Sequence, residues 1–134
     1  MHALRHLRNQ RGAASAELVV ATPLLLLLVL AVVQFALWQH AVHVADAAAQ
    51  EGARAARLEG GTVAAGQAKA EQMLGQLGRT TVLDPHVTVR RDAEHARVEV
   101  HGYASAVLPF LRLPVSASTD GPVERFRPAP AAGP

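Results

Sequence analysis

The sequence predicts an α+β protein with one long N-terminal helix that crosses a membrane, a second short helix, and a small antiparallel sheet of about three strands. Three observations predict this fold. Residues 18–38 contain no charged side chain. Residues 39–58 contain no proline and are mostly strong helix formers. From residue 86 onward, apolar residues alternate with polar ones, which is the period of a half-buried strand.

The apolar run from Leu18 to Trp38 is 21 residues long. As a helix it covers roughly 31 Å, which matches a hydrocarbon core of about 30 Å. The rest of the chain is too small to bury a helix that is apolar on every side, so we expect a membrane helix. Pro23 is expected to kink it, with Thr22 or a neighbour bonding the carbonyl that the proline frees. Gln34, the lone amide in the run, is expected to bond another helix or to lie near the outer interface.

A basic leader, residues 1–12, precedes the apolar run. Its arginines are Arg5, Arg8 and Arg11, and by the positive-inside rule they place the N-terminus in the cytoplasm and the residues after Trp38 outside. Without the leader the chain carries 10 basic and 11 acidic residues, a net charge of −1 with histidine neutral. We therefore expect no nucleic-acid partner, since that function needs a basic face on the folded domain.

A secretory signal that is removed after export is an alternative interpretation of this segment. The apolar part of such a signal is about 7–15 residues long and closes on small residues soon afterwards. Here the small-residue stretch Ala45–Ala49 follows several polar residues and comes late. Cleavage near Ala45 stays open as an alternative to a retained membrane helix.

Glu17 stands directly against the apolar run, five residues after Gly12. An ionised carboxylate there is costly unless it is paired, although it could also extend to the inner headgroups. If the chain were cut after Gly12, Ala13 would carry a free ammonium and Glu17 would be the fifth residue. In a helical assembly, one subunit's carboxylate would then neutralise its neighbour's amine.

The stretch RGAASAELVVATPLLLLLVLAVVQFALWQ resembles the N-terminus of the TadE-like minor pseudopilins of the tight-adherence (Flp-type) pilus system, within the type IV pilin superfamily. Gly12, Ala13, Glu17 and Pro23 match the family's cleavage site, charged position and helix proline. Residues 48–58, AAQEGARAARL, are similar to the family's alanine-rich segment outside the membrane. One departure is Leu18, where several TadE-like proteins have an aromatic residue.

The resemblance implies assembly rather than catalysis, with no cofactor. Prepilin peptidase would cut between Gly12 and Ala13, and Glu17 and Pro23 would act in assembly. The implied partners are prepilin peptidase, the major Flp-type pilin, other pseudopilins, membrane lipid and the pilus assembly platform with its cytoplasmic ATPase. The implied location is the cytoplasmic membrane, with possible incorporation in an extracellular pilus. The chain is longer than a major Flp pilin, which favours the minor class.

Beyond the membrane we expect the helix to continue to about Leu58, giving a helical unit over residues 13–60. A small α+β domain over 61–126 and a disordered tail over 127–134 would follow. Small residues recur four apart along the helix extension, which permits close helix packing. They are Ala41, Ala45 and Ala49, and again Ala48, Gly52 and Ala56.

The domain's elements follow from its periodicity. Apolar residues near one face predict a second helix over Thr62–Leu77 that stops at Gly78. Alternation about Val87 and Val98 predicts a hairpin whose turn is Asp92 to His95, with a bulge at Gly102 before Tyr103. We expect Val107–Leu113 to be an apolar loop broken by Pro109. A third strand is expected around Val115, Ala117 and Thr119.

The sequence shows no catalytic motif and no metal-ligand spacing, so we expect neither an enzyme nor a metal protein. Two groups of polar residues could suggest metal ligands, and we interpret both as ordinary surface positions. They are His40, His43 and Asp46 on the helix, and His86, His95 and His101 on the hairpin. Two other functions remain open. One is an unprocessed single-pass anchor that presents a small binding module, and the other is a membrane-tethered enzyme.

Overall fold

The computed structural model describes the backbone of residues 3–125 and the side chains of Gly12 and residues 14–125. The expected tail, 127–134, lies outside the described residues, as do the side chains of most of the leader. The elements in chain order are α1 (Ala3–Arg57), α2 (Val63–Leu77), β1 (Val82–Arg91), β2 (His95–Ala104) and β3 (Pro114–Pro122). Two helices and three antiparallel strands confirm the α+β prediction.

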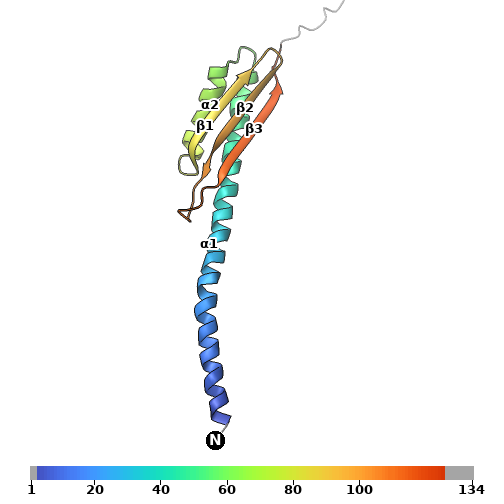
Figure 1. Ribbon diagram of the computed structural model, residues 1–134. Helices are drawn as coiled ribbons and strands as arrows, with labels where there is room; N and C mark the ends of the chain where they lie inside the picture. The colour runs from blue at the N-terminus through green and yellow to red at the C-terminus, as the bar shows by residue number, and fades with distance from the viewer. Residues whose placement is uncertain (1–2, 126–134) are drawn as a thin grey trace, which may run out of the picture.

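Helix α1 forms the long axis of the molecule (Figure 1). Its 55 residues extend about 80 Å at the rise of an α-helix. The upper part packs against the rest of the chain, whereas the lower part stands alone. Because α1 begins at Ala3, the backbone passes the expected cleavage site at Gly12 without a break.

Pro23 lies inside α1 and does not end it. A proline at this position leaves the carbonyl of Val19 without its usual donor. Of the expected partners for this carbonyl, Thr22 was wrong, because its hydroxyl donates to the carbonyl of Leu18 at 2.8 Å. A helical threonine can bond the carbonyl three or four residues before itself, and Thr22 bonds the one four residues before.

The strands form one antiparallel sheet in the order β1-β2-β3. The β1–β2 turn is closed by Asp92, whose carboxylate accepts hydrogen bonds from the backbone N–H groups of His95 and Glu94, both at 2.7 Å. These bonds, that of His95 first, favour the charged form and lower the pKa of Asp92 below its ordinary 3.8. The predicted hairpin and its turn are confirmed.

The predicted bulge occurs at the expected level of the hairpin, but it lies in β1 rather than at Gly102 of β2. The register slips in β1, between Leu83 and His86, and the residue opposite the slip is Gly102. A Cβ atom on Gly102 would lie 2.7 Å from the Cγ1 atom of Val82, so the glycine leaves room for the bulged strand. Asp84, inside the slip, has a positive φ of 48°. The glycine that led to the prediction, Gly102, therefore faces the bulge and does not form it.

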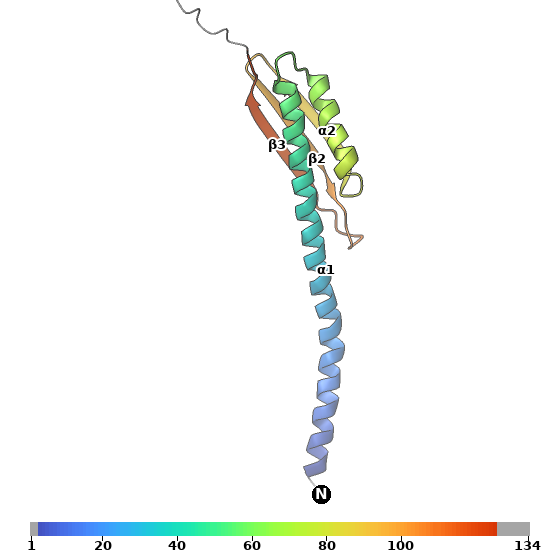
Figure 2. The same cartoon turned by 180° about the vertical axis from the view of Figure 1, so that it is seen from behind.

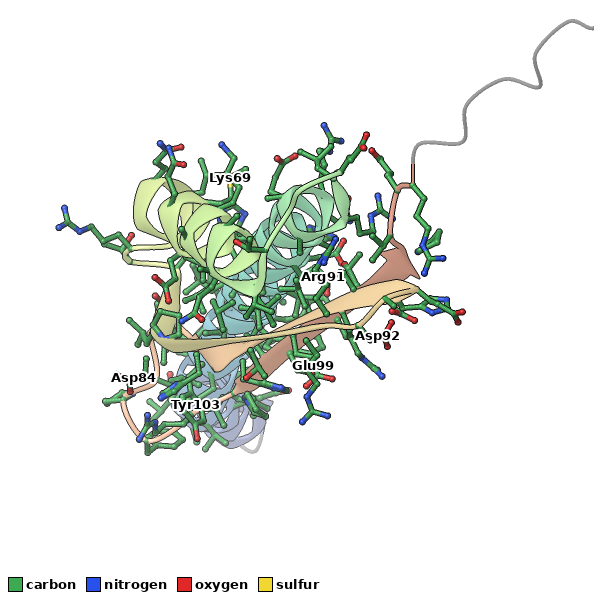
Figure 3. All side chains as sticks on the ribbon, turned by 90° about the horizontal axis from the view of Figure 1, so that it is seen from above. Lys69, Asp84, Arg91, Asp92, Glu99 and Tyr103 are labelled. Carbon is green, nitrogen blue, oxygen red and sulfur yellow. The ribbon has the colours of Figure 1, made fainter. Side chains whose placement is uncertain are left out.

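Both helices cover the same face of the sheet, and the other face is open (Figures 2 and 3). Helix α1 lies over β2 and β3, and α2 lies over β1. The sheet contributes its largest fully buried side chains, Val98, Val100 and Val115. Opposite them α1 contributes almost only alanine, all fully or nearly fully buried: Ala41, Ala45, Ala48, Ala49, Ala53 and Ala56.

Small residues also set the distance between the two helices. A Cβ atom on Gly66 of α2 would lie 2.9 Å from the Gly52 carbonyl oxygen and 2.9 Å from the Ala56 Cβ atom. A Cβ atom on Gly52 would lie equally close to Ala70 and to the Gly66 carbonyl. The small-residue spacing seen in the sequence thus serves packing within the chain. The helix predicted over Thr62–Leu77 begins at Val63 with Thr62 as its cap, and at its end the Gly78 N–H bonds the Leu74 carbonyl.

Two glycine substitutions in α2 separate helix packing from helix propensity. We expect Gly66→Ala to lower the free energy of unfolding by about 1–3 kcal/mol, because the added methyl group overpacks the crossing with α1. Gly75→Ala is the matched control, since nothing lies within 4 Å of the added methyl group. It should raise stability by up to about 1 kcal/mol through helix propensity. Denaturant unfolding of the full chain in detergent measures both, and equal effects would contradict the crossing.

Candidate assembly and membrane site

The lower part of α1 presents a bare apolar surface. Every described side chain from Ala14 to Val33 is exposed, and the large apolar ones range from 37% exposed at Leu30 to 73% at Val19. This helix is long and apolar enough to cross a membrane, by length and composition. An apolar surface of this extent is stable only when lipid or other helices cover it.

Glu17 marks the lower edge of this surface. Its side chain is exposed, and no ion pair or hydrogen bond reaches it from the part of the chain that the structure describes. The backbone of Ala13 lies one turn earlier in α1, and its side chain is outside the described residues. Gly12 has open space around it, because a Cβ atom added there would meet nothing within 4 Å. The outer domain therefore leaves this stretch free for other molecules.

Glu17 and Pro23 lie on one helix but on different sides of it. Six residues correspond to about 9 Å along the axis and about 240° around it. The two side chains therefore point to different faces of α1, and one straight neighbouring helix cannot contact both. The structure brings Gly12, Ala13 and Glu17 together at the lower end of α1, whereas Pro23 lies higher and on another face.

Going up α1, Gln34 is the first side chain that hydrogen-bonds the domain. Among the described residues it is the one polar side chain that is almost fully buried, 2% exposed. Its Nε2 donates to the Ser105 carbonyl at 3.2 Å, and its Oε1 accepts from the Val107 N–H at 3.0 Å. Of the two expectations for Gln34, the partner on another helix was wrong, and the place near the outer interface stays a prediction. The amide instead pairs with backbone groups of the loop between β2 and β3.

Trp38 makes the second contact of this kind, one turn above Gln34. Its indole N–H donates to the Pro114 carbonyl at 3.0 Å, and its ring lies 5.9 Å from that of Phe35. The tryptophan is half-buried against the core. It therefore has an apolar body in the domain and a polar end that is already paired.

The spacing of residues in the sequence indicates the contacts of Gln34 and Trp38, although neither contact was predicted from it. The residues that face the domain follow one stripe of α1 at steps of three or four residues. They are Gln34, Trp38, Ala41, Ala45, Ala48, Gly52 and Ala56. The buried alanines were recognised, and extending the stripe downward by two steps would have reached Trp38 and then Gln34.

The histidines considered as ligands do not come together as one group. His86 pairs with His101 across the strands, whereas His95 lies at the far end of β2, opposite Pro122. On α1, Asp46 accepts a hydrogen bond from Gln50 at 2.7 Å. Among the residues that the structure describes, no three His, Cys, Asp or Glu side chains lie close enough together to hold a metal ion.

The open face of the sheet is polar. Glu99 lies at its centre and pairs with Arg97 at 3.1 Å and with His101 at 3.8 Å. Figure 3 shows Glu99 and Tyr103 on the side of the sheet away from both helices. Contacts between partly exposed polar side chains of this kind contribute little to stability, and the face is suited to water.

Comparison with known proteins confirms the family resemblance. Residues 12–54 match the family model described as TadE-like protein. The match begins at Gly12, contains Glu17, Pro23 and Gln34, and ends three residues before α1 does. No curated protein and no solved structure matches the chain. The interpretation of the described residues beyond Arg57 therefore depends on their sequence and structure alone.

Replacing Gln34 tests whether it holds the loop. We expect Gln34→Leu to leave the Ser105 carbonyl and the Val107 N–H without partners, at a cost of about 1–3 kcal/mol each where they stay buried. The Val107 amide should then exchange its hydrogen much faster with solvent. Gln50→Leu is the control, because Gln50 is exposed on the same helix and bonds only within it. Unchanged exchange at Val107 in Gln34→Leu would show that the loop is held by other contacts.

Proposed function

We propose that this TadE-like chain is a minor pseudopilin of a Tad (Flp-type) pilus or a related secretion apparatus, cut by prepilin peptidase after Gly12. The observation that carries the proposal is the division of α1. Its lower part is apolar and uncovered, with Glu17 at the edge, and its upper part is the spine of a folded domain. A subunit stored in a membrane and later packed against other helices needs both parts.

The orientation follows from charge. The leader's arginines favour the cytoplasmic side, so the α+β domain lies outside the cytoplasmic membrane. The domain is compatible with that side, because its open sheet face is polar and carries no bare apolar surface comparable to that of α1. We infer a single-pass protein with a cytoplasmic N-terminus, available for incorporation in an extracellular filament.

Cleavage creates the charge that assembly uses. Cutting after Gly12 leaves an ammonium on Ala13, and Glu17 is a carboxylate without a partner in the described chain. Both charges are costly at the edge of a membrane and more costly between packed helices. A neighbouring subunit shifted along the axis would bring its amine to this Glu17 and thereby fix the axial register. Glu17 is thus proposed as an assembly residue, and Pro23 as a local adjustment of the helix backbone.

The partners follow from this role. Prepilin peptidase would act at the membrane's inner edge, where the structure leaves Gly12 open. The major Flp-type pilin and other pseudopilins would cover the bare face of α1, and the assembly platform would extract the helix from lipid. The role is structural and requires no cofactor and no catalytic residue.

The alternative is an unprocessed single-pass anchor that presents the domain as a binding module. It explains the bare helix equally well. It gives no reason for an unpaired glutamate at the fifth position after a glycine, and this feature favours the pseudopilin.

Processing is tested by the N-terminal residue and intact mass of the protein from native membranes, with and without active prepilin peptidase. We expect a start at Ala13 that depends on the peptidase and is lost in Gly12→Leu. The control is Gly75→Leu, at a second glycine with open space around it. A start at Met1 in every case would favour the plain anchor, and a start beyond Ala45 would favour a secreted domain.

The role of Glu17 is tested separately from processing. We expect Glu17→Gln to be cut at Ala13 as before but to be absent from filaments, because it leaves the neighbour's buried ammonium unpaired, at a cost of about 3–5 kcal/mol. Glu59→Gln makes the same change at an exposed position beyond the end of α1 and should assemble normally. Immunoblots of sheared filaments measure incorporation. Normal incorporation of Glu17→Gln would remove the ion pair from the mechanism.

A further inference from the structure

The loop of residues 105–113, between β2 and β3, is mostly apolar although several of its side chains are exposed. It reads SAVLPFLRL. Phe110 is 80% exposed, the highest value of any large apolar side chain described, and Val107 is 42% exposed. Leu113 alone packs against the core. Exposed apolar side chains on this loop, beside the bare apolar part of α1, mark a surface for interaction.

The position of the loop identifies the partner. Gln34 holds the loop at Ser105 and Val107, and it lies four residues before Trp38, where the apolar run ends. Four residues correspond to about 6 Å along the axis, on the membrane side of Trp38. Figures 1 and 2 both show this loop as the lowest part of the domain, beside α1 and directed toward its N-terminus.

We propose that the 105–113 loop inserts into the outer leaflet of the membrane that α1 crosses, with Phe110 as its anchor. The proposal rests on the membrane insertion of α1 proposed above. The occupant of the loop surface is phospholipid at the boundary between headgroups and acyl chains. Amphipathic elements enter that boundary by about 5–10 Å, which matches the level set by Gln34.

Part of the loop backbone is already paired within the protein. At this depth polar backbone groups need partners within the protein. Gln34 pairs with the Ser105 carbonyl and the Val107 N–H, and the Leu111 N–H bonds the Leu108 carbonyl at 3.0 Å. Pro109 has no N–H to satisfy. This explains why a buried amide stands in the last turns of an otherwise apolar run.

The residues around the loop suit the headgroup region. Arg112 is exposed, pairs with Asp84 at 3.3 Å and lies 4.2 Å over the ring of Tyr103. Tyrosine, tryptophan and arginine are the side chains that concentrate at membrane interfaces, where an apolar body and a polar end are both accommodated. Tyr103 near the end of β2, Arg112 within the loop and Trp38 one turn above Gln34 are residues of this kind next to the proposed insertion.

Site-directed spin labelling measures the depth of the loop in the full chain. The protein has no cysteine, so each single cysteine carries one nitroxide. We would label Ala106→Cys in the loop, Leu25→Cys in the apolar run and Ser118→Cys on the open face of the sheet. Each labelled chain is reconstituted at high dilution in vesicles of phosphatidylcholine with a minority of phosphatidylglycerol. Collision rates with oxygen, which concentrates in the bilayer, and with a nickel chelate, which stays in water, report depth.

We expect the label at 106 to favour oxygen over nickel, less strongly than the label at 25, while the label at 118 favours nickel. Adding Phe110→Asp to the Ala106→Cys chain should return the label to the water-exposed ratio. Adding Leu58→Asp, at an exposed leucine just beyond the end of α1, should leave it unchanged.

Three results would overturn the inference in distinguishable ways. A label at 106 that matches 118 while 25 stays deep removes loop insertion and leaves the anchored helix intact. A label at 25 that is open to nickel removes the membrane insertion on which the proposal rests. A label at 106 that is shielded only at high protein density assigns the loop surface to a second copy of the chain rather than to lipid.

Discussion

The packing of α1 against the sheet and α2 is the constraint on which the rest of the structure depends. The same helix must expose an apolar surface on all sides from Leu18 to Val33 and must pack closely against the sheet from Ala41 onward. The alanines and Gly52 make the second task possible, because their small side chains let Val98, Val100 and Val115 reach the helix surface. The same stripe of α1 continues down through Trp38 to Gln34, where small residues give way to side chains that bond the domain's backbone. The domain is therefore fixed to α1 both by packing and by two polar contacts at its lower edge.

This attachment decides what the bare part of α1 can do. The domain covers α1 only from Gln34 upward, so the described apolar surface below Gln34 is available on all sides. Glu17 lies about 25 Å below Gln34 along the axis, too far for any contact from the domain. A neighbouring helix can therefore approach Glu17 from any direction without rearrangement of the fold. A rigid upper half and an open lower half are what a subunit needs if it moves from lipid into a helical array.

The sequence was sufficient for features that depend on local pattern and insufficient for those that depend on distant pairs. The apolar run, the second helix with its stop at Gly78, and the Asp92 turn each follow from residues close together in the chain, and all appear in the structure. Gln34 was assigned the wrong kind of partner because its acceptor and donor lie 71 and 73 residues away, in a loop without a motif. The bulge was placed on the wrong strand because the visible glycine faces it rather than forms it. In the lower part of α1, the roles of Gly12, Ala13 and Glu17 stay predictions, which rest on the family resemblance and on the spacing that cleavage would give them, because packing within the described chain gives these residues no role.

The uncut helix also bears on how processing changes the site. In the full chain α1 is continuous from Ala3, so the backbone N–H groups around Ala13 lie within the helix and bond earlier carbonyls. A cut after Gly12 removes those carbonyls and leaves the first N–H groups of the shortened helix without partners. The new end then carries the ammonium charge together with about half a positive charge from the helix dipole. A positive end of this size at a membrane edge favours a nearby carboxylate, and Glu17 of the same chain, one turn away, can satisfy only part of it. On the proposed function, processing would turn a continuous stretch of helix into a charged end that a neighbouring carboxylate stabilises, and the cut itself would then have a role in assembly.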